Sequence, residues 1–361
     1  MSETKILEGL ELLKHLSLVF GPTGSEEYVA DEIVRQLEGT GVEIIRDRMS
    51  NVFAVKRANA YPVQTVMLSA HMDEVGFIIK DIDGDGYIRF ACLGGIDSRV
   101  LCGRKVTFRG KEGDVSGVIA SKAIHHQSAE ERKNATKAND MYVDIGATSK
   151  EDAESVLSRG DSGTFDSEFV IFGENDAYAK CKALDDRLGC VVMIEILRKL
   201  KEENVELPFD LVCAFTVREE IGISGATAAA HRFRPDYAIV LETTAIADLP
   251  DVPKNSRVSE VGAGGVVSLM DRSTIYNRDF VDAAMKIAEE NGIPAQIKRY
   301  VSGGNDAGHI HKSADGTRCL AISAPTRYLH SASCVISIKD FESIKSHVYA
   351  ILTNYDFSEE I

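Results

Sequence analysis

The chain contains no tryptophan, and it has fewer basic than acidic side chains. Its 41 lysines and arginines against 56 aspartates and glutamates give a formal charge of −15 over 361 residues. Binding to nucleic-acid phosphates or to anionic lipid needs a positive surface, so we expect neither nucleic acid nor membrane as a partner. No hydrophobic run approaches the roughly 18 residues that predict a transmembrane helix. Disorder is excluded as well, because 44% of the residues are hydrophobic and can form a core.

The seven cysteines are scattered and never form a C-x-x-C pair. Their odd number and irregular spacing argue against a disulfide framework. The chain opens with charged residues among its leucines rather than with the apolar stretch of a secretory signal. We therefore expect a reducing, cytoplasmic location.

The pattern of hydrophobic residues changes twice along the chain. In residues 1–75 and 178–361, amphipathic helices alternate with short buried strands, which is typical of a mixed or parallel sheet covered by helices. In residues 76–177, which hold 13 of the 29 glycines, short strands dominate, as in a small barrel or sandwich. The sequence therefore predicts an α/β fold with a mixed central sheet flanked by helices. Its two pieces, residues 1–75 and 178–361, would be interrupted by a small β-barrel domain at residues 76–177.

One helix start can be placed from its local sequence. Thr23 and Glu26 form a capping-box pattern, in which each side chain bonds a free backbone N–H at the helix start. The apolar residues Val29, Ile33 and Leu37 follow at helical spacing. We therefore expect a capped helix here.

Histidine and acidic side chains follow the predicted buried strands of the sheet. Functional groups of open α/β sheets gather beyond the carboxyl ends of the strands, so these side chains are candidates for a common site. They are His71 and Asp73, Asp185, the pair Glu219 and Glu220, Glu242, and His330. Two histidines and several carboxylates at one edge suit a pair of divalent metal ions.

Two of these groups have a spacing that fits metal chemistry. In His71-x-Asp73, a carboxylate near a metal-binding imidazole can accept the proton of its second ring nitrogen and so fix the tautomer. Glu219 and Glu220 leave a buried strand side by side, and their mutual repulsion would be costly without a cation. One of the two could bind metal while the other remains free as a base.

In six blocks, the chain resembles the di-metal aminopeptidases of metallopeptidase family 42, which include glutamyl and deblocking aminopeptidases and assemble into tetrahedral particles. The blocks are Gly21-Pro22-Thr23-Gly24-Ser25-Glu26-Glu27, Ala70-His71-Met72-Asp73-Glu74-Val75-Gly76, Asp185-Asp186-Arg187-Leu188-Gly189, Glu219-Glu220-Ile221-Gly222 with Gly225-Ala226, Gly303-Gly304-Asn305-Asp306-Ala307-Gly308, and Arg327-Tyr328-Leu329-His330-Ser331. Six blocks in the same order across nearly the whole chain make the resemblance specific.

The resemblance implies a zinc-exopeptidase-like fold and assigns a role to each candidate. Asp185 would bridge two metal ions, Zn²⁺ first and Co²⁺ or Mn²⁺ as alternatives. His71 and Glu242 would complete the ligands of one ion, and Glu220 and His330 would complete those of the other. Asp73 would orient His71, and Glu219 would be the general base while a metal-bridging hydroxide attacks the substrate. The implied activity is removal of N-terminal residues from short peptides. The inserted β-rich domain would mediate dimerisation, and dimers would assemble into a dodecamer.

Two positions depart from the family pattern. Many members have aspartate where this chain has Glu242, and in related di-metal peptidases this choice follows aminopeptidase or carboxypeptidase preference. The glycine-rich block has Asn305 where threonine is usual, and His309 and His311 follow it. The spacing of these two histidines leaves open a contact with metal or substrate.

Two other functions remain open from the sequence. A glycoside hydrolase would use two carboxyl groups on either side of one bond. That function leaves His71 and His330 without a role, and a chain without tryptophan lacks a favoured sugar-stacking surface. A non-catalytic scaffold of the same fold is the second alternative, and the complete set of candidate residues argues against it.

Overall fold

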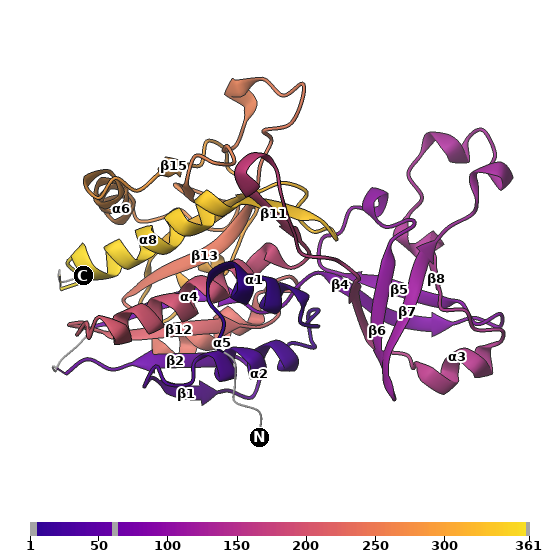
Figure 1. The fold of residues 1–361 in the computed structure, drawn as a ribbon, viewed down its shortest axis with the longest axis horizontal. Helices are drawn as coiled ribbons and strands as arrows, with labels where there is room; N and C mark the ends of the chain where they lie inside the picture. Colours follow the sequence, from indigo (N-terminus) through magenta and orange to yellow (C-terminus); the bar gives the residue numbers. More distant parts are fainter. Residues whose placement is uncertain (1–5, 60–63, 359–361) are drawn as a thin grey trace.

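The computed structural model describes residues 6–59 and 64–358, and it consists of a sheet-and-helix body with a β-barrel to one side (Figure 1). The largest sheet has the strand order β1-β2-β12-β3-β13-β16-β14-β15. Its central strands β12, β3, β13 and β16 run parallel, and β2 and β14 pair with them in the antiparallel sense. The predicted mixed sheet is thus confirmed. The strand bounds are Glu43–Arg46 (β1), Val52–Lys56 (β2), Thr65–His71 (β3), Asp210–Thr216 (β12), Tyr237–Ala245 (β13), Gly265–Val267 (β14), Ala295–Ile297 (β15) and Arg318–Thr326 (β16).

The helices cover this sheet because its central strands are apolar on both faces. The long helix α4 contacts β3 and β13, α8 contacts β14 and β16, and α1 packs on α4. The helix bounds are Gly9–Leu18 (α1), Glu27–Gln36 (α2), Lys150–Val156 (α3), Leu184–Glu202 (α4), Ser224–Phe233 (α5), Arg278–Glu290 (α6), Ala307–Ile310 (α7) and Ile338–Asn354 (α8). In the part of the chain that the structure describes, none of these helices has the length and apolar character needed to cross a bilayer.

The inserted segment forms a closed barrel in the order β4-β5-β8-β7-β6-β9, with its own hydrophobic cluster. The prediction of a barrel is therefore confirmed. Its strands are Gly76–Ile82 (β4), Ile88–Leu93 (β5), Lys105–Gly110 (β6), Gly113–Ala120 (β7), Tyr142–Asp144 (β8) and Ser162–Phe165 (β9). The chain then returns to the body through a three-stranded sheet of β10 (Val170–Phe172), β11 (Tyr178–Cys181) and β17 (Cys334–Ser337).

The predicted capping box is wrong in its contacts, although α2 does begin there. No side chain caps the helix at Glu26. The Thr23 hydroxyl instead donates to Asp73 Oδ2 at 2.8 Å, and Glu26 Oε1 accepts from the backbone N–H groups of Gly24 and Arg218. The Thr23 hydroxyl is therefore used as a donor by the buried Asp73 carboxylate, whereas Glu26 serves as an acceptor for its own turn and for the loop after β12.

Candidate metal centre

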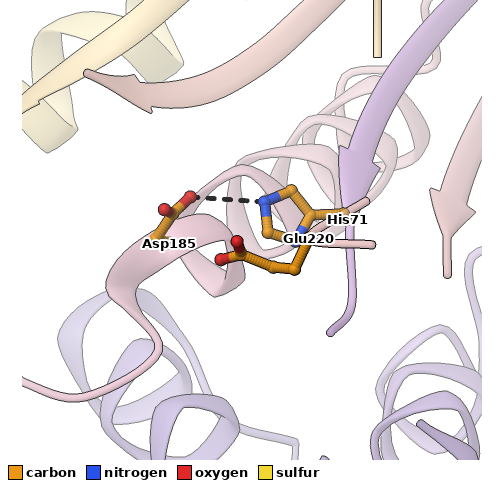
Figure 2. A group of neighbouring side chains, drawn as sticks. All are labelled: His71, Asp185 and Glu220. Atoms are coloured by element: carbon orange, nitrogen blue, oxygen red, sulfur yellow. Dashed lines mark hydrogen bonds and ion pairs between the residues drawn. The ribbon is translucent and has the colours of Figure 1, made fainter. Parts of the chain in front are cut away.

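The predicted site residues meet at the carboxyl ends of the four parallel strands. His71 ends β3, the Glu219-Glu220 turn follows β12, and Glu242 lies on β13. His330 follows β16, and Asp185 lies in the first turn of α4. The sheet thereby brings together residues that are up to 259 positions apart, and Figure 2 shows three of them, His71, Asp185 and Glu220, around a common space.

Asp185 lies at the centre of the cluster because each of its carboxylate oxygens contacts a different histidine. Its Oδ1 is 3.2 Å from His71 Nε2, and its Oδ2 is 3.3 Å from His330 Nε2. The Glu242 carboxylate lies 3.7 Å from His71 Nε2, and that of Glu220 lies 3.4 Å from His330 Nε2. The cluster therefore divides into two groups that share Asp185.

Both histidines direct Nε2 into the cluster because their other nitrogen is bonded to the backbone. His71 Nδ1 lies 3.0 Å from the carbonyl oxygen of Asp73, and His330 Nδ1 lies 2.9 Å from that of Gly95. A carbonyl oxygen only accepts, so Nδ1 is the donor in each ring and Nε2 of the neutral imidazole has a free lone pair. Each histidine is thus arranged to offer one nitrogen to a metal ion.

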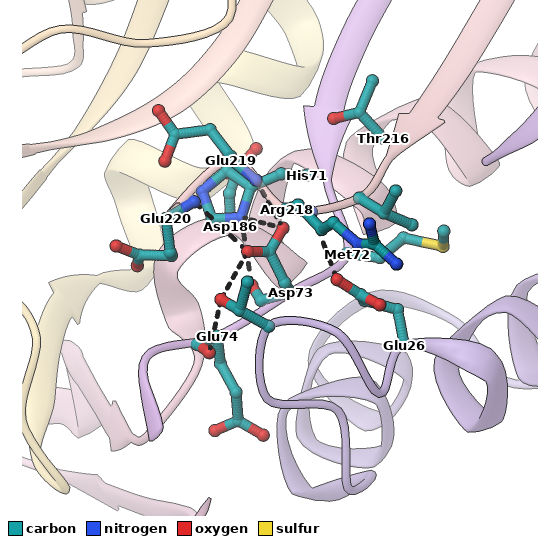
Figure 3. A network of polar contacts seen from close by, with 12 residues as sticks. Glu26, His71, Met72, Asp73, Glu74, Asp186, Thr216, Arg218, Glu219 and Glu220 are labelled. Carbon is teal, nitrogen blue, oxygen red and sulfur yellow. Dashed lines mark hydrogen bonds and ion pairs between the residues drawn. The ribbon is translucent and has the colours of Figure 1, made fainter. Parts of the chain in front are cut away.

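Asp73 supports the site without facing its centre. Its carboxylate accepts the backbone N–H groups of Glu219 and Glu220, at 3.0 and 3.2 Å, and lies 3.5 Å from His71 Nδ1 (Figure 3). These donors and His71 hold the pKa of Asp73 below its ordinary value against the opposing effect of burial. A single ionised carboxylate therefore fixes the turn that carries both glutamates.

Burial and neighbouring carboxylates raise the pKa of all three glutamates of the cluster. Burial and the charge of Asp185 raise the pKa of Glu242 to about 8 and that of Glu220 to about 7. Burial, followed by the charges of Glu242 and Asp306, raises the pKa of Glu219 well above its ordinary value. Among the described residues, the Glu219 carboxylate has no hydrogen-bond or salt-bridge partner, so it remains free to exchange a proton.

The surrounding negative charge raises the pKa of both histidines and so favours their positively charged form. Burial lowers the pKa of His330, but the hydrogen bond to Asp185 and the charge of Glu220 outweigh it and raise the pKa to about 10. Burial also lowers the pKa of His71, but the charge of Glu242 and the hydrogen bond to Asp185 outweigh it and raise that pKa well above its ordinary value. The cluster therefore attracts positive charge, which either protons or metal ions can supply.

The donor atoms fit divalent metal ions in chemistry and spacing. Nitrogen and carboxylate oxygen ligands suit Zn²⁺, Co²⁺ and Mn²⁺. A tetrahedral zinc ion with bonds of about 2.0–2.1 Å separates neighbouring donor atoms by about 3.3 Å. The four contacts of 3.2 to 3.7 Å described above agree with that spacing. One donor atom from each of His71, Asp185 and Glu220 also lies within 4.8 Å of the others.

Several supporting residues were not found by sequence reasoning. Arg187 is fully buried and donates to the carbonyl oxygens of Met72 and Gly21, so it holds the chain that follows His71. The buried Asp306 accepts the hydroxyl groups of Ser69 and Thr216 beneath the site. Arg187 and Asp306 lie in the sequence blocks that match the family, and this match could have identified them. The Gly95 carbonyl is a backbone group, so no sequence signal could have identified it.

His309 and His311 contact other groups. His309 Nδ1 bonds the hydroxyl of Thr227 at 2.7 Å, and His311 Nδ1 bonds the carbonyl oxygen of Ala307 at 2.7 Å. Neither histidine has a contact with the cluster among the described residues.

A parallel-stranded sheet whose carboxyl ends hold two histidines and several buried carboxylates is the arrangement of a metallopeptidase. The model of the M42 glutamyl aminopeptidase family matches residues 50–346, and the chain belongs to this family. The lysyl aminopeptidase of Pyrococcus furiosus is 30% identical over 95% of this chain and 96% of its own length.

Solved structures agree over nearly the full chain. The TET aminopeptidase of a marine sediment archaeon of the Thaumarchaeota has 36% identity, a TM-score of 0.92 and 96% coverage of both chains. The TET1 peptidase of Pyrococcus horikoshii has 33% identity and a TM-score of 0.84, covering 96% of this chain and 99% of that one. The chain is therefore a peptidase of the aminopeptidase type.

Proposed function

We propose that this protein is a co-catalytic di-metal aminopeptidase that removes N-terminal residues from short peptides. The observation that carries the proposal is the central position of Asp185, whose two oxygens each contact the Nε2 of a different histidine. A carboxylate so placed can bridge two ions. His71 and Glu242 would hold one of them, and Glu220 and His330 the other.

Two divalent ions at this site, when bound, would polarise the scissile carbonyl group and lower the pKa of a water molecule. The residues around them control access and orientation. The side chain of His330 is 28% exposed, against 2% for His71. A peptide would therefore approach over His330, while the deeper groups exclude bulk water.

Glu219 would move the protons. It would accept one proton from the attacking water and donate it to the leaving amine, a role that requires a carboxylate outside the metal ligands. Its adjacent partner Glu220 contacts His330, whereas the Glu219 carboxylate has no such contact among the described residues. Its raised pKa makes the carboxylate a stronger base, which favours acceptance of the proton and its retention until it passes to the amine.

The rival functions fit this site less well. A glycoside hydrolase needs two separate carboxyl groups, one on each side of a sugar bond. Here the carboxylates share histidine partners instead, and both imidazoles would be unused. A scaffold without catalysis would have no need to keep a half-buried Glu219, without a carboxylate partner among the described residues, at a metal-binding cluster.

The function can be tested with peptides that differ only at the amino terminus. We expect release of the first residue from a panel of short peptides, no release from the same peptides after N-acetylation, and no cleavage of cello-oligosaccharides. Activity should disappear on chelation and return with zinc, cobalt or manganese. Cleavage of the oligosaccharides, or of the peptides from the carboxyl terminus, would contradict the proposal.

We also propose that the chain assembles into a dodecamer built from dimers. The TET1 peptidase of Pyrococcus horikoshii is described as forming a tetrahedron or a large octahedral shell. Light scattering at micromolar concentration should give a mass near twelve chains of 39.4 kDa. A monomer mass would reject this proposal without affecting the proposed chemistry.

A cytoplasmic location is the remaining part of the proposal. It is supported by the free state of all seven cysteines, five of them buried. Fractionation of the source cells would test it, and recovery of the protein outside the cytoplasm would contradict it.

A further inference from the structure

We propose that the β-barrel positions the ligands of one of the two metal ions, through the turn Gly94-Gly95 and the residue Ser167. Both positions lie on the barrel segment, Gly94-Gly95 between β5 and β6 and Ser167 just after β9. The inference rests on the proposed di-metal site, and it makes the barrel a part of the metal centre.

The first contact fixes the ring of His330. His330 Nδ1 donates to the carbonyl oxygen of Gly95 at 2.9 Å, and this bond directs Nε2 toward Asp185 and Glu220. No other hydrogen bond to Nδ1 is present among the described residues. The barrel turn therefore sets both the tautomer and the orientation of this candidate ligand.

The second contact holds the loop on which His330 lies. Arg327 and Val335 exchange two backbone hydrogen bonds, which close the loop at its base. At its far side, Ala332 packs into the hydrophobic cluster of the barrel, and its carbonyl oxygen accepts the Ser167 hydroxyl at 2.6 Å. His330 itself has a left-handed φ of 56°, so the loop backbone is held in a constrained conformation.

The third contact concerns Glu220. Gly94 has a φ of +83°, and a Cβ atom added there would lie 3.0 Å from Glu220 Oε2 and 2.7 Å from a methyl group of Val75. The barrel backbone thus packs directly against the Glu220 carboxylate. Any larger residue at position 94 would push that carboxylate away from its place beside His330.

The other group of ligands is held differently. His71 bonds the Asp73 carbonyl, and Glu242 Oε1 accepts the backbone N–H of Thr243, so both depend on the sheet-and-helix body. Barrel contacts are therefore concentrated on Glu220 and His330. A change in the barrel should weaken one ion and spare the other.

The test compares Gly94→Ala with Gly103→Ala. Both glycines have a φ of +83°, so both substitutions carry the same backbone strain, but a Cβ at Gly103 would meet no atom of the described residues within 4 Å. Without metal, the Glu220 carboxylate can rotate away from the new methyl group. With metal it cannot, so the effect should fall on metal affinity.

Metal binding is measured by titration calorimetry and elemental analysis on the chelated, full-length protein. We expect wild type to bind two zinc ions, and we expect Gly103→Ala to bind both of them as tightly as wild type does. Gly94→Ala should keep one ion at wild-type affinity and bind the second at least tenfold more weakly. Two ions at wild-type affinity in Gly94→Ala would overturn the inference, whereas failure of wild type to bind two ions would overturn the proposed function instead.

A second pair of variants avoids the steric change. Ser167→Ala removes the bond to the Ala332 carbonyl and the acceptor of the Lys182 backbone N–H at 3.3 Å, and Ser25→Ala removes a different serine contact between barrel and body, to Ser162 at 3.1 Å. Ser167→Ala should weaken the second ion and change the visible spectrum of the cobalt-loaded protein, whereas Ser25→Ala should do neither. Equal behaviour of the two variants would contradict the inference even if Gly94→Ala fails to fold.

Discussion

Replacement of Glu219 by glutamine should lower kcat by about 10²- to 10⁴-fold while two metal ions remain bound per chain. Glutamine has the shape of glutamate, but its amide cannot accept the proton of the attacking water. Asp73 would still hold the turn, because it bonds the backbone of residues 219 and 220 rather than their side chains. Steady-state kinetics on a short peptide and elemental analysis of the same sample give both values.

Glu220→Gln is the matched control, because it makes the same chemical change at the adjacent position. Glu220 contacts His330, so this variant should lose affinity for one ion as well as activity. If Glu219→Gln keeps wild-type kcat, or if it loses metal as Glu220→Gln does, the assignment of Glu219 as general base is wrong.

Replacement of Asp185 by alanine should remove both metal ions and abolish activity. Each of its oxygens contacts one of the two histidines, and among the described residues no other carboxylate contacts both. Elemental analysis after dialysis against trace zinc measures the loss.

Glu242→Ala provides the comparison, since among the described residues Glu242 contacts His71 but not His330. This variant should lose one ion and keep the other. A preparation of Asp185→Ala that still holds two ions would contradict the bridging role, and loss of both ions from Glu242→Ala would show that the two positions are not independent.

The residues of the candidate site could be named from the sequence because each follows a strand or begins a helix at one edge of a parallel sheet. His71, Glu219, Glu220 and Glu242 carry this signal locally. The structure brings them together with Asp185 and His330, although their roles as ligands and base remain predictions. Strand order was the missing information, and residue spacing alone does not contain it.

The contacts that support these residues could not be predicted. The Gly95 carbonyl belongs to the backbone, lies 235 positions from His330 and has no chemical signature in a sequence. The sequence predicts a helix cap at Thr23, but a threonine hydroxyl can bond the start of a helix or a distant carboxylate equally well. Only the fold shows that Asp73, 50 positions away, is the group that it bonds.

At the level of the fold, the closed barrel and the mixed sheet were predictable from the change between short glycine-separated strands and alternating helices and strands. The pairing of β11 with β17 could not be predicted, because Tyr178–Cys181 and Cys334–Ser337 are far apart in the sequence. β17 also contacts β16 and α4, and no local sequence pattern records such long-range contacts.

The most direct test of the account is a metal titration of the chelated protein with peptide hydrolysis as the readout. Zinc or cobalt is added stepwise, and release of the N-terminal residue is measured together with the number of bound ions. We expect activity to rise to a plateau at two ions per chain, and Asp185→Ala to remain inactive throughout. Full activity of the chelated protein, or a plateau at one bound ion, would contradict a di-metal aminopeptidase.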